Sequence, residues 1–87
     1  MEIRKQKSLT PTRLELIRVS QNMTQSDLAK KSGVKLRAIQ CYEQQTRPID
    51  GARLGTLLDL CIALDCSIID ILEEEENIQK FNLVFWF

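Results

Sequence analysis

Between Thr10 and Glu74, apolar residues recur every three or four positions, which is the spacing of helices that bury one face. Residues that favour turns separate the apolar stretches, among them Gly33 and the segment 45–51, which contains Pro48 and Gly51. The pattern predicts five helices in this part of the chain. We therefore expect an all-α protein, folded as a compact five-helix bundle.

The outer helices of this bundle are predicted from their ends and their apolar faces. Thr10 followed by Pro11 is a typical helix start, and the first helix should end near Asn22. The fourth helix is expected over 52–64, and a fifth, capped by Ser67 and Asp70, should end near residue 74. The residues expected to face the core are Leu14, Ile17 and Arg18, then Leu54, Leu57, Leu60, Cys61 and Leu64, and finally Ile68, Ile71 and Leu72.

Residues 24–44 are predicted to form two short helices joined by a tight turn. Thr24 and Asp27 have the spacing of a capping box, and Gly33 suits a left-handed turn at the end of the first of these helices. The small Ala29 allows a close crossing of the two helices, and Val34, Ile39 and Tyr42 fill the angle between them. The other side chains of the second helix are left free for a partner.

This stretch resembles the helix-turn-helix of the lambda-repressor and Cro-like family of bacterial and phage regulators, also called the xenobiotic-response-element (XRE) family. The resemblance covers roughly residues 14–72. It rests on Thr24-Gln25, Leu28-Ala29, Ser32-Gly33-Val34, Ile39 and Tyr42-Glu43, and downstream on Thr56-Leu57-Leu58, Ala63-Leu64 and Cys66-Ser67-Ile68. It implies a transcription regulator that binds double-stranded DNA with sequence specificity, usually a repressor acting as a homodimer. A cytoplasmic protein is expected separately, because the chain shows neither a leader nor a long apolar run.

The resemblance places the outward surface of helix 35–45 in the major groove of DNA, so base contacts are expected from side chains that the core does not use. Arg37 suits the two acceptors of a guanine, Gln40 the edge of an adenine, and Leu36 the methyl group of a thymine. The alternative is a solvated helix face, and Leu36 and Cys41 also suit packing at the helix margin. The outward set is Lys35, Leu36, Arg37, Gln40, Cys41 and Gln44.

Other residues are candidates for the DNA backbone or for support. The family's use of a glutamine at the start of the first motif helix assigns a phosphate contact to Gln25. Arg47 is either a second phosphate contact or a solvated loop cation. Related repressors pair an arginine of helix one with a glutamate like Glu43, so Arg18 is expected to hold that carboxylate, to reach a phosphate, or both.

Three positions depart from the family pattern. Lys35 stands where a capping Ser, Thr or Asn is usual, and a missing cap costs about 1 kcal/mol. A lysine there also opposes the helix dipole until a phosphate lies nearby, which favours a DNA role for Lys35. Gln45 and Asp65 replace glycines that usually follow helices three and four, so both turns are expected to be reshaped.

The formal net charge is zero, but the charge is unevenly distributed along the chain. Residues 1–48 contain ten basic and four acidic residues, a net charge of +6, and residues 49–87 carry −6. The first half is therefore the plausible surface for a polyanion, and its affinity for DNA should fall steeply with salt.

The 87 residues suffice for one domain, which we divide into a basic arm (1–10), the DNA-binding domain (11–74) and an acidic-to-aromatic tail (75–87). The absence of histidine, of a long apolar run and of a leader argues against metal sites, a membrane span and secretion. No cofactor is expected, and no constellation of catalytic residues indicates an enzyme. Cys41, Cys61 and Cys66 are expected to be reduced thiols, two of them buried, with a redox role for Cys41 as the alternative.

The tail carries much apolar surface, and exposing that surface to water is unfavourable. The alternation of Phe81, Leu83, Phe85 and Phe87 suits a strand that pairs with its symmetry mate, and an irregular wrapped tail fits as well. The candidates for a homodimer interface are Ile62, Ile69, Phe81, Leu83, Phe85, Trp86 and Phe87. The alternative function is a protein-interaction module with the same fold, such as the antitoxin of a toxin–antitoxin pair.

Overall fold

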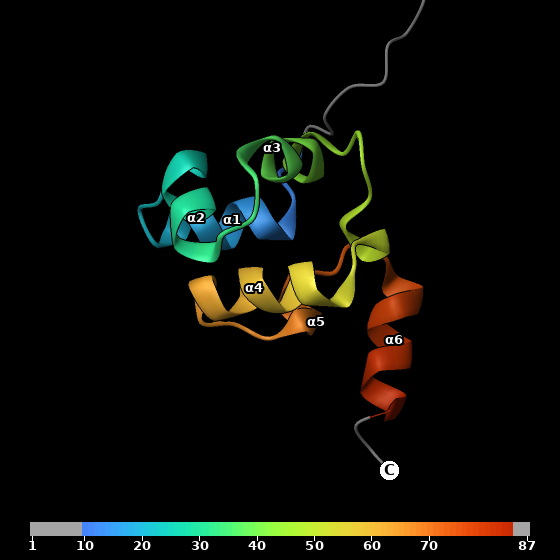
Figure 1. The fold of residues 1–87 in the computed structure, drawn as a ribbon. Helices are drawn as coiled ribbons and strands as arrows, with labels where there is room; N and C mark the ends of the chain where they lie inside the picture. The colour runs from blue at the N-terminus through green and yellow to red at the C-terminus, as the bar shows by residue number, and fades with distance from the viewer. Residues whose placement is uncertain (1–9, 85–87) are drawn as a thin grey trace, which may run out of the picture.

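A computed structural model of the protein describes residues 10–84, and all its regular elements are helical (Figure 1). They are α1 (Arg13–Ser20), α2 (Gln25–Ser32), α3 (Leu36–Gln44), a 3-10 turn η1 (Ile49–Gly51), α4 (Leu54–Leu64), α5 (Ile68–Ile71) and α6 (Glu75–Val84). The all-α class is confirmed, and over residues 10–84 there are six α-helices where five were expected. The expected arm (1–10) and Phe85, Trp86 and Phe87 lie outside the described residues, apart from Thr10.

The helices pack as a bundle in which α2 contacts both α3 and α4, and α1 contacts α3 and α5. Figure 1 shows α3 on one side of this bundle and α4 with α5 on the opposite side, while α6 stands beside them. The core is formed by Leu14, Leu28, Val34, Ile39, Tyr42, Ile49, Leu57, Leu60, Cys61, Ala63, Leu64 and Ile71. This packing leaves one long face of α3 outside the core.

Local hydrogen bonds begin α1 and α2. The Thr24 hydroxyl accepts from the Asp27 amide at 2.9 Å, and the Asp27 carboxylate accepts from the Thr24 amide at 2.9 Å, which is the expected capping box. The first helix starts two residues beyond the expected Thr10-Pro11 start. Its N-cap is Thr12, whose buried hydroxyl accepts from the amide of Glu15.

The turns after α3 and α4 keep the left-handed geometry that glycine usually supplies. Gln45 has φ 63° and Asp65 has φ 54°. The amide of Thr46 donates to the carbonyl of Cys41, and the amide of Cys66 donates to that of Cys61, as in a Schellman motif. The expectation of reshaped turns was wrong, because these hydrogen bonds hold a non-glycine residue in the strained conformation.

One burial expectation failed at the start of α4. Leu54 was expected in the core and is 63% exposed, because α4 begins at Leu54 rather than residue 52 and its first turn lies at the margin of the bundle. Ile49 fills the core instead and is 3% exposed. The loop 45–51 therefore contributes to packing through η1, although its Pro48 and Gly51 mark it as a helix break.

The expected strand or wrapped tail was wrong over residues 81–84, which belong to the helix α6 (Glu75–Val84). Asp50 in η1 organises the start of this helix. Its carboxylate accepts from the amides of Glu73 at 2.8 Å and Glu74 at 3.1 Å, and from the Asn77 side chain at 2.9 Å. Asp50 thus caps α6 from a position more than 20 residues earlier in the chain. The cap favours a helix even where the alternation of apolar residues from Phe81 onwards suggested a strand.

The left-handed turns predict that Gln45→Gly and Asp65→Gly each stabilise the protein. Relief of the strain exceeds the entropy that glycine adds to the unfolded chain, for a net gain of about 0.5–1 kcal/mol. Gly33→Ala is the matched reverse change, since Gly33 has φ 79° and open space around its Cβ position, and should cost about 1 kcal/mol. Urea unfolding measures all three, and a loss of stability in both glycine variants would contradict the assignment of strain.

Candidate nucleic-acid interface

The two helices of the turn motif are joined over three residues. The amide of left-handed Gly33 donates to the carbonyl of Ala29 at 2.9 Å and closes α2. Ala29 is half-buried, Val34 is buried after the turn, and Ile39 and Tyr42 are 0% and 6% exposed on the inward face of α3. These contacts leave the opposite face of α3 turned away from the core.

The outward face of α3 carries the side chains singled out as base readers. Lys35, Leu36, Arg37 and Gln44 are exposed, and Gln40 and Cys41 are half-buried. Lys35 is the N-cap of α3 and its side chain makes no capping hydrogen bond. Leu36 is 38% exposed and thus combines a helix-margin contact with an open apolar surface.

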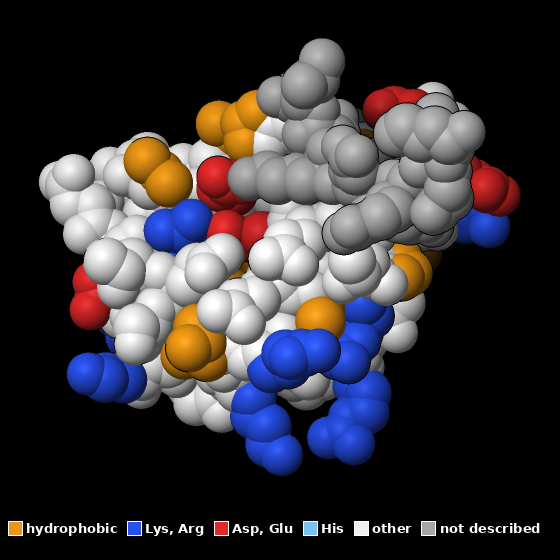
Figure 2. Space-filling view, turned by 90° about the horizontal axis from the view of Figure 1, so that it is seen from above, with side chains coloured by type: hydrophobic (Ala, Val, Ile, Leu, Met, Phe, Trp, Pro, Cys, Tyr) orange, Lys and Arg blue, Asp and Glu red, His pale blue; other side chains and the backbone are white. Residues whose placement is uncertain are grey.

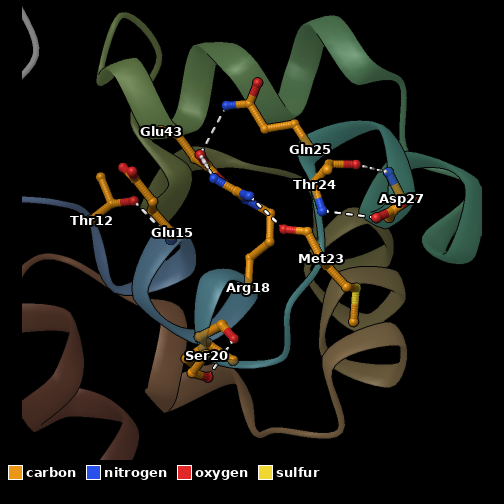
Figure 3. Close-up of polar contacts among 10 residues, drawn as sticks. Thr12, Glu15, Arg18, Ser20, Met23, Thr24, Gln25, Asp27 and Glu43 are labelled. Carbon is orange, nitrogen blue, oxygen red and sulfur yellow. Dashed lines mark hydrogen bonds and ion pairs between the residues drawn. The ribbon is translucent and has the colours of Figure 1, made fainter.

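A buried ion pair fixes the last turn of α3 to α1 (Figure 3). Arg18 donates to the Glu43 carboxylate twice, from Nε at 2.7 Å and from Nη2 at 2.9 Å, and it donates to the Met23 carbonyl from Nη1 at 2.7 Å. The two side chains are 10% and 2% exposed. The hydrogen bond to Glu43 raises the pKa of Arg18, which keeps the guanidinium charged despite its burial. The expected pair between these residues is present.

Gln25 joins the same network. Its Nε2 donates to Glu43 Oε1 at 2.9 Å, so one carboxylate links α1, α2 and α3 (Figure 3). The side-chain amide of glutamine has two N–H donors and an oxygen acceptor. The contact with Glu43 therefore orients Gln25 and leaves it a second donor for a partner. Sequence reasoning missed this contact, because Gln25 and Glu43 are 18 residues apart.

Cations gather around a groove between the start of α3 and the start of α4. The groove has a volume of about 500 Å³, and its lining includes Lys35, Arg47, Arg53 and one carboxylate, Asp59. The Arg47 guanidinium lies 6.0 Å from the centre of the Tyr42 ring. Figure 2, a view of the side that carries α3, shows Lys and Arg side chains gathered along one edge. Sequence reasoning missed Arg53. The available signal was its position, because Arg53 directly precedes a helix, as Lys35 does.

The three cysteines differ in their surroundings. The Thr46 hydroxyl, with smaller contributions from Arg37 and Arg47, lowers the pKa of the Cys41 thiol. Burial raises the pKa of Cys61, and that of Cys66 to about 12. All three are free thiols, and Cys61 alone among them is buried, where two buried thiols were expected.

A family model of the Cro/C1-type HTH DNA-binding domain matches residues 13–77, which is most of the chain. The chain belongs to this family. The resemblance to lambda-repressor and Cro-like proteins is thereby confirmed, and the protein is a helix-turn-helix DNA-binding domain of the kind found in transcription regulators. No curated protein and no solved structure matches the chain.

Residues 10–84 show neither a membrane-spanning helix nor a cluster of metal ligands. No helix there has the length and apolar character needed to cross a membrane. No group of three or more His, Cys, Asp and Glu side chains in the same range is arranged to hold a metal ion.

The ion pair predicts the effect of Glu43→Ala in this Cro/C1-type domain. Removing the carboxylate leaves buried Arg18 without its charge partner and releases Gln25, so the free energy of unfolding should fall by about 3 kcal/mol. DNA binding should weaken as α3 loosens, although no DNA contact is removed. Gln44→Ala, on the exposed side of the same turn, should change stability by less than about 0.5 kcal/mol. Chemical unfolding compares the stability of the two variants, and DNA titration measures the affinity of Glu43→Ala. Wild-type melting and wild-type affinity in Glu43→Ala would reject this role.

The thiol environments predict an order of alkylation. Iodoacetamide reacts with the thiolate, so the lowered pKa makes Cys41 the fastest site near neutral pH and the raised pKa makes Cys66 the slowest. Raising the pH towards 12 should narrow the difference as the other thiols ionise. Timed labelling followed by trypsin separates Cys41, in peptide Ala38–Arg53, from the other two in Leu54–Lys80. Equal labelling rates of the two peptides would contradict the assignment.

Proposed function

We propose that this Cro/C1-type protein is a sequence-specific transcription regulator, a repressor in our assignment, that inserts α3 into the major groove of its operator. The observation that carries the proposal is the division of α3 into two faces. Ile39, Tyr42 and Glu43 are buried against the bundle, and the opposite face presents polar and cationic side chains. A helix held in this way offers a rigid row of donors to base edges.

Base readout is assigned to the outward face. Arg37 is exposed and suits a bidentate contact with guanine, and half-buried Gln40 suits adenine. Leu36 provides the apolar contact for a thymine methyl, and Gln44 extends the row by one turn. Cys41 lies between these side chains, so its alkylation should interfere with binding.

Backbone contacts are assigned to the cations around the groove and to Gln25. Lys35, Arg47 and Arg53 line the same groove and are exposed, so they present their charges together beside α3. Gln25 keeps a donor beyond its bond to Glu43. Arg18 uses three of its N–H donors in hydrogen bonds to Glu43 and Met23. This favours a role in holding α3 in place over a phosphate contact.

We also propose a homodimer, because one domain of this size offers few base contacts and a two-fold pair doubles them on a palindromic operator. The supporting observation is apolar surface outside the core. Leu54, Leu58 and Ile62 follow one another at four-residue spacing on α4 and are 63%, 43% and 77% exposed. Leu83 and Val84 at the end of α6 are exposed as well, whereas Ile69 and Phe81 are half-buried.

The same apolar surface supports a second candidate function, a protein-interaction module such as an antitoxin. A stripe of three exposed aliphatic side chains suits a helix from a different protein as well as one from a second copy. The two candidates differ in what they require of DNA, since a module that acts only through protein contacts needs no preferred DNA sequence.

Selection from a random duplex pool, followed by titration of the enriched duplex, tests the proposal. Arg37→Ala should cost about 1–3 kcal/mol on the selected sequence and relax the preference at one base pair. Arg53→Gln should weaken all duplexes alike and reduce the slope of log affinity against log salt by about 1.

Lys80→Gln is the matched control, because Lys80 is exposed on α6 and pairs with Glu76 in the same helix. It removes one positive charge from the protein and should leave both the affinity and the salt slope unchanged. If selection enriches no sequence and binding stays weak at low salt, the interaction module replaces the regulator.

A further inference from the structure

The turn that ends α4 brings two cysteines together. In a Schellman motif, the residue two positions beyond the C-cap meets the side chain of the residue that starts the last turn of the helix. Here these residues are Cys66 and Cys61, and the amide of Cys66 donates to the carbonyl of Cys61 at 3.1 Å. Asp65 between them holds the left-handed conformation, with φ 54°. The same motif at the end of α3 joins Cys41 to Thr46, so only the α4 turn pairs two thiols.

Both thiols line one surface groove, of about 430 Å³, between α4 and α5. Its apolar walls include Leu58, Ile62 and Ile68. Cys61 is 6% exposed and Cys66 is half-buried. Each thiol influences the pKa of the other: Cys66 acts to lower that of Cys61, and Cys61 acts to raise that of Cys66. The two residues thus line the same groove, at a place that a small reagent reaches from solvent.

We propose that Cys61 and Cys66 form a reversible dithiol site that closes to a disulfide by exchange with a small-molecule disulfide. The Cys61 thiolate attacks one sulfur of the reagent, which forms a mixed disulfide and breaks the reagent's S–S bond. Cys66 then loses its proton and attacks Cys61. The Cys61–Cys66 bond forms, and the second half of the reagent leaves as a thiol. Two protons and two electrons pass from the protein to the reagent, which becomes two thiols.

The structure also sets the character of this site. Burial raises the pKa of both thiols, so exchange is slow at neutral pH and faster in mild alkali. The turn lies at the opposite side of the bundle from α3 in Figure 1. The proposal therefore does not depend on DNA binding. The bridge closes a loop that the native fold already forms, so it constrains mainly the unfolded chain.

The experiment incubates the folded protein with 2-hydroxyethyl disulfide at mildly alkaline pH, traps free thiols with iodoacetamide and digests with trypsin. Peptide Leu54–Lys80 contains both cysteines, and Ala38–Arg53 contains Cys41. We expect Leu54–Lys80 to lack the mass of two hydrogen atoms and to carry no alkyl group, in the wild type and in Cys41→Ser. In Cys66→Ser, which keeps buried Cys61 and hence the core, this bridge should be absent.

Two results would overturn the proposal. One is a Leu54–Lys80 peptide in which both cysteines are alkylated, or each carries its own half of the reagent, after Cys41 has reacted to completion. The other is a bridged protein with a lower Tm than the reduced form. A lower Tm would mean that the disulfide strains the native fold, and hence that the fold does not place the two sulfurs at bonding distance. A higher Tm for the bridged wild type, absent from Cys66→Ser treated in the same way, supports it.

Discussion

The ion pair between Arg18 and Glu43 is the constraint on which the proposed DNA-binding surface depends. It joins α1 to the last turn of α3, and the bond from Gln25 brings α2 into the same network. The rest of α3 is weakly anchored at its ends, because Lys35 gives no side-chain cap and Gln45 closes the helix in a strained conformation. A buried charge that loses its partner is costly, so the pair strongly disfavours any arrangement of the three helices that separates it.

This constraint explains how a small neutral domain presents a surface for DNA. The inward side of α3 is occupied by Ile39, Tyr42 and Glu43, which leaves the outward side to residues without a packing role. Lys35, Arg47 and Arg53 border one groove although they come from three separate segments, namely the start of α3, the loop after it and the start of α4. The zero net charge of the chain therefore does not describe the surface beside α3.

Features that depend on neighbouring residues were predictable from the sequence, and those that depend on distant contacts were not. The capping box at Thr24 and the left-handed Gly33 follow from spacing within one turn. The helical state of residues 75–84 depends on Asp50, and the orientation of Gln25 depends on Glu43, and no local pattern encodes either contact. The Arg18–Glu43 pair was expected only because a known family suggested it. For the candidate site, the outward residues of α3 followed from helical periodicity, whereas Arg53 joined the site because the fold brings the start of α4 to the groove that Lys35 lines.

A double-mutant cycle on Arg18 and Glu43 tests the central claim most directly, because it isolates the energy of the pair from the cost of orphaning either charge. The two single variants, Arg18→Met and Glu43→Met, and the double variant are unfolded in urea beside the wild type. A buried, doubly hydrogen-bonded pair should give a coupling energy of about 2–3 kcal/mol, so that the double variant is much more stable than the sum of the single losses implies. Additive losses, with a coupling energy near zero, would show that the pair does not hold α3 in place.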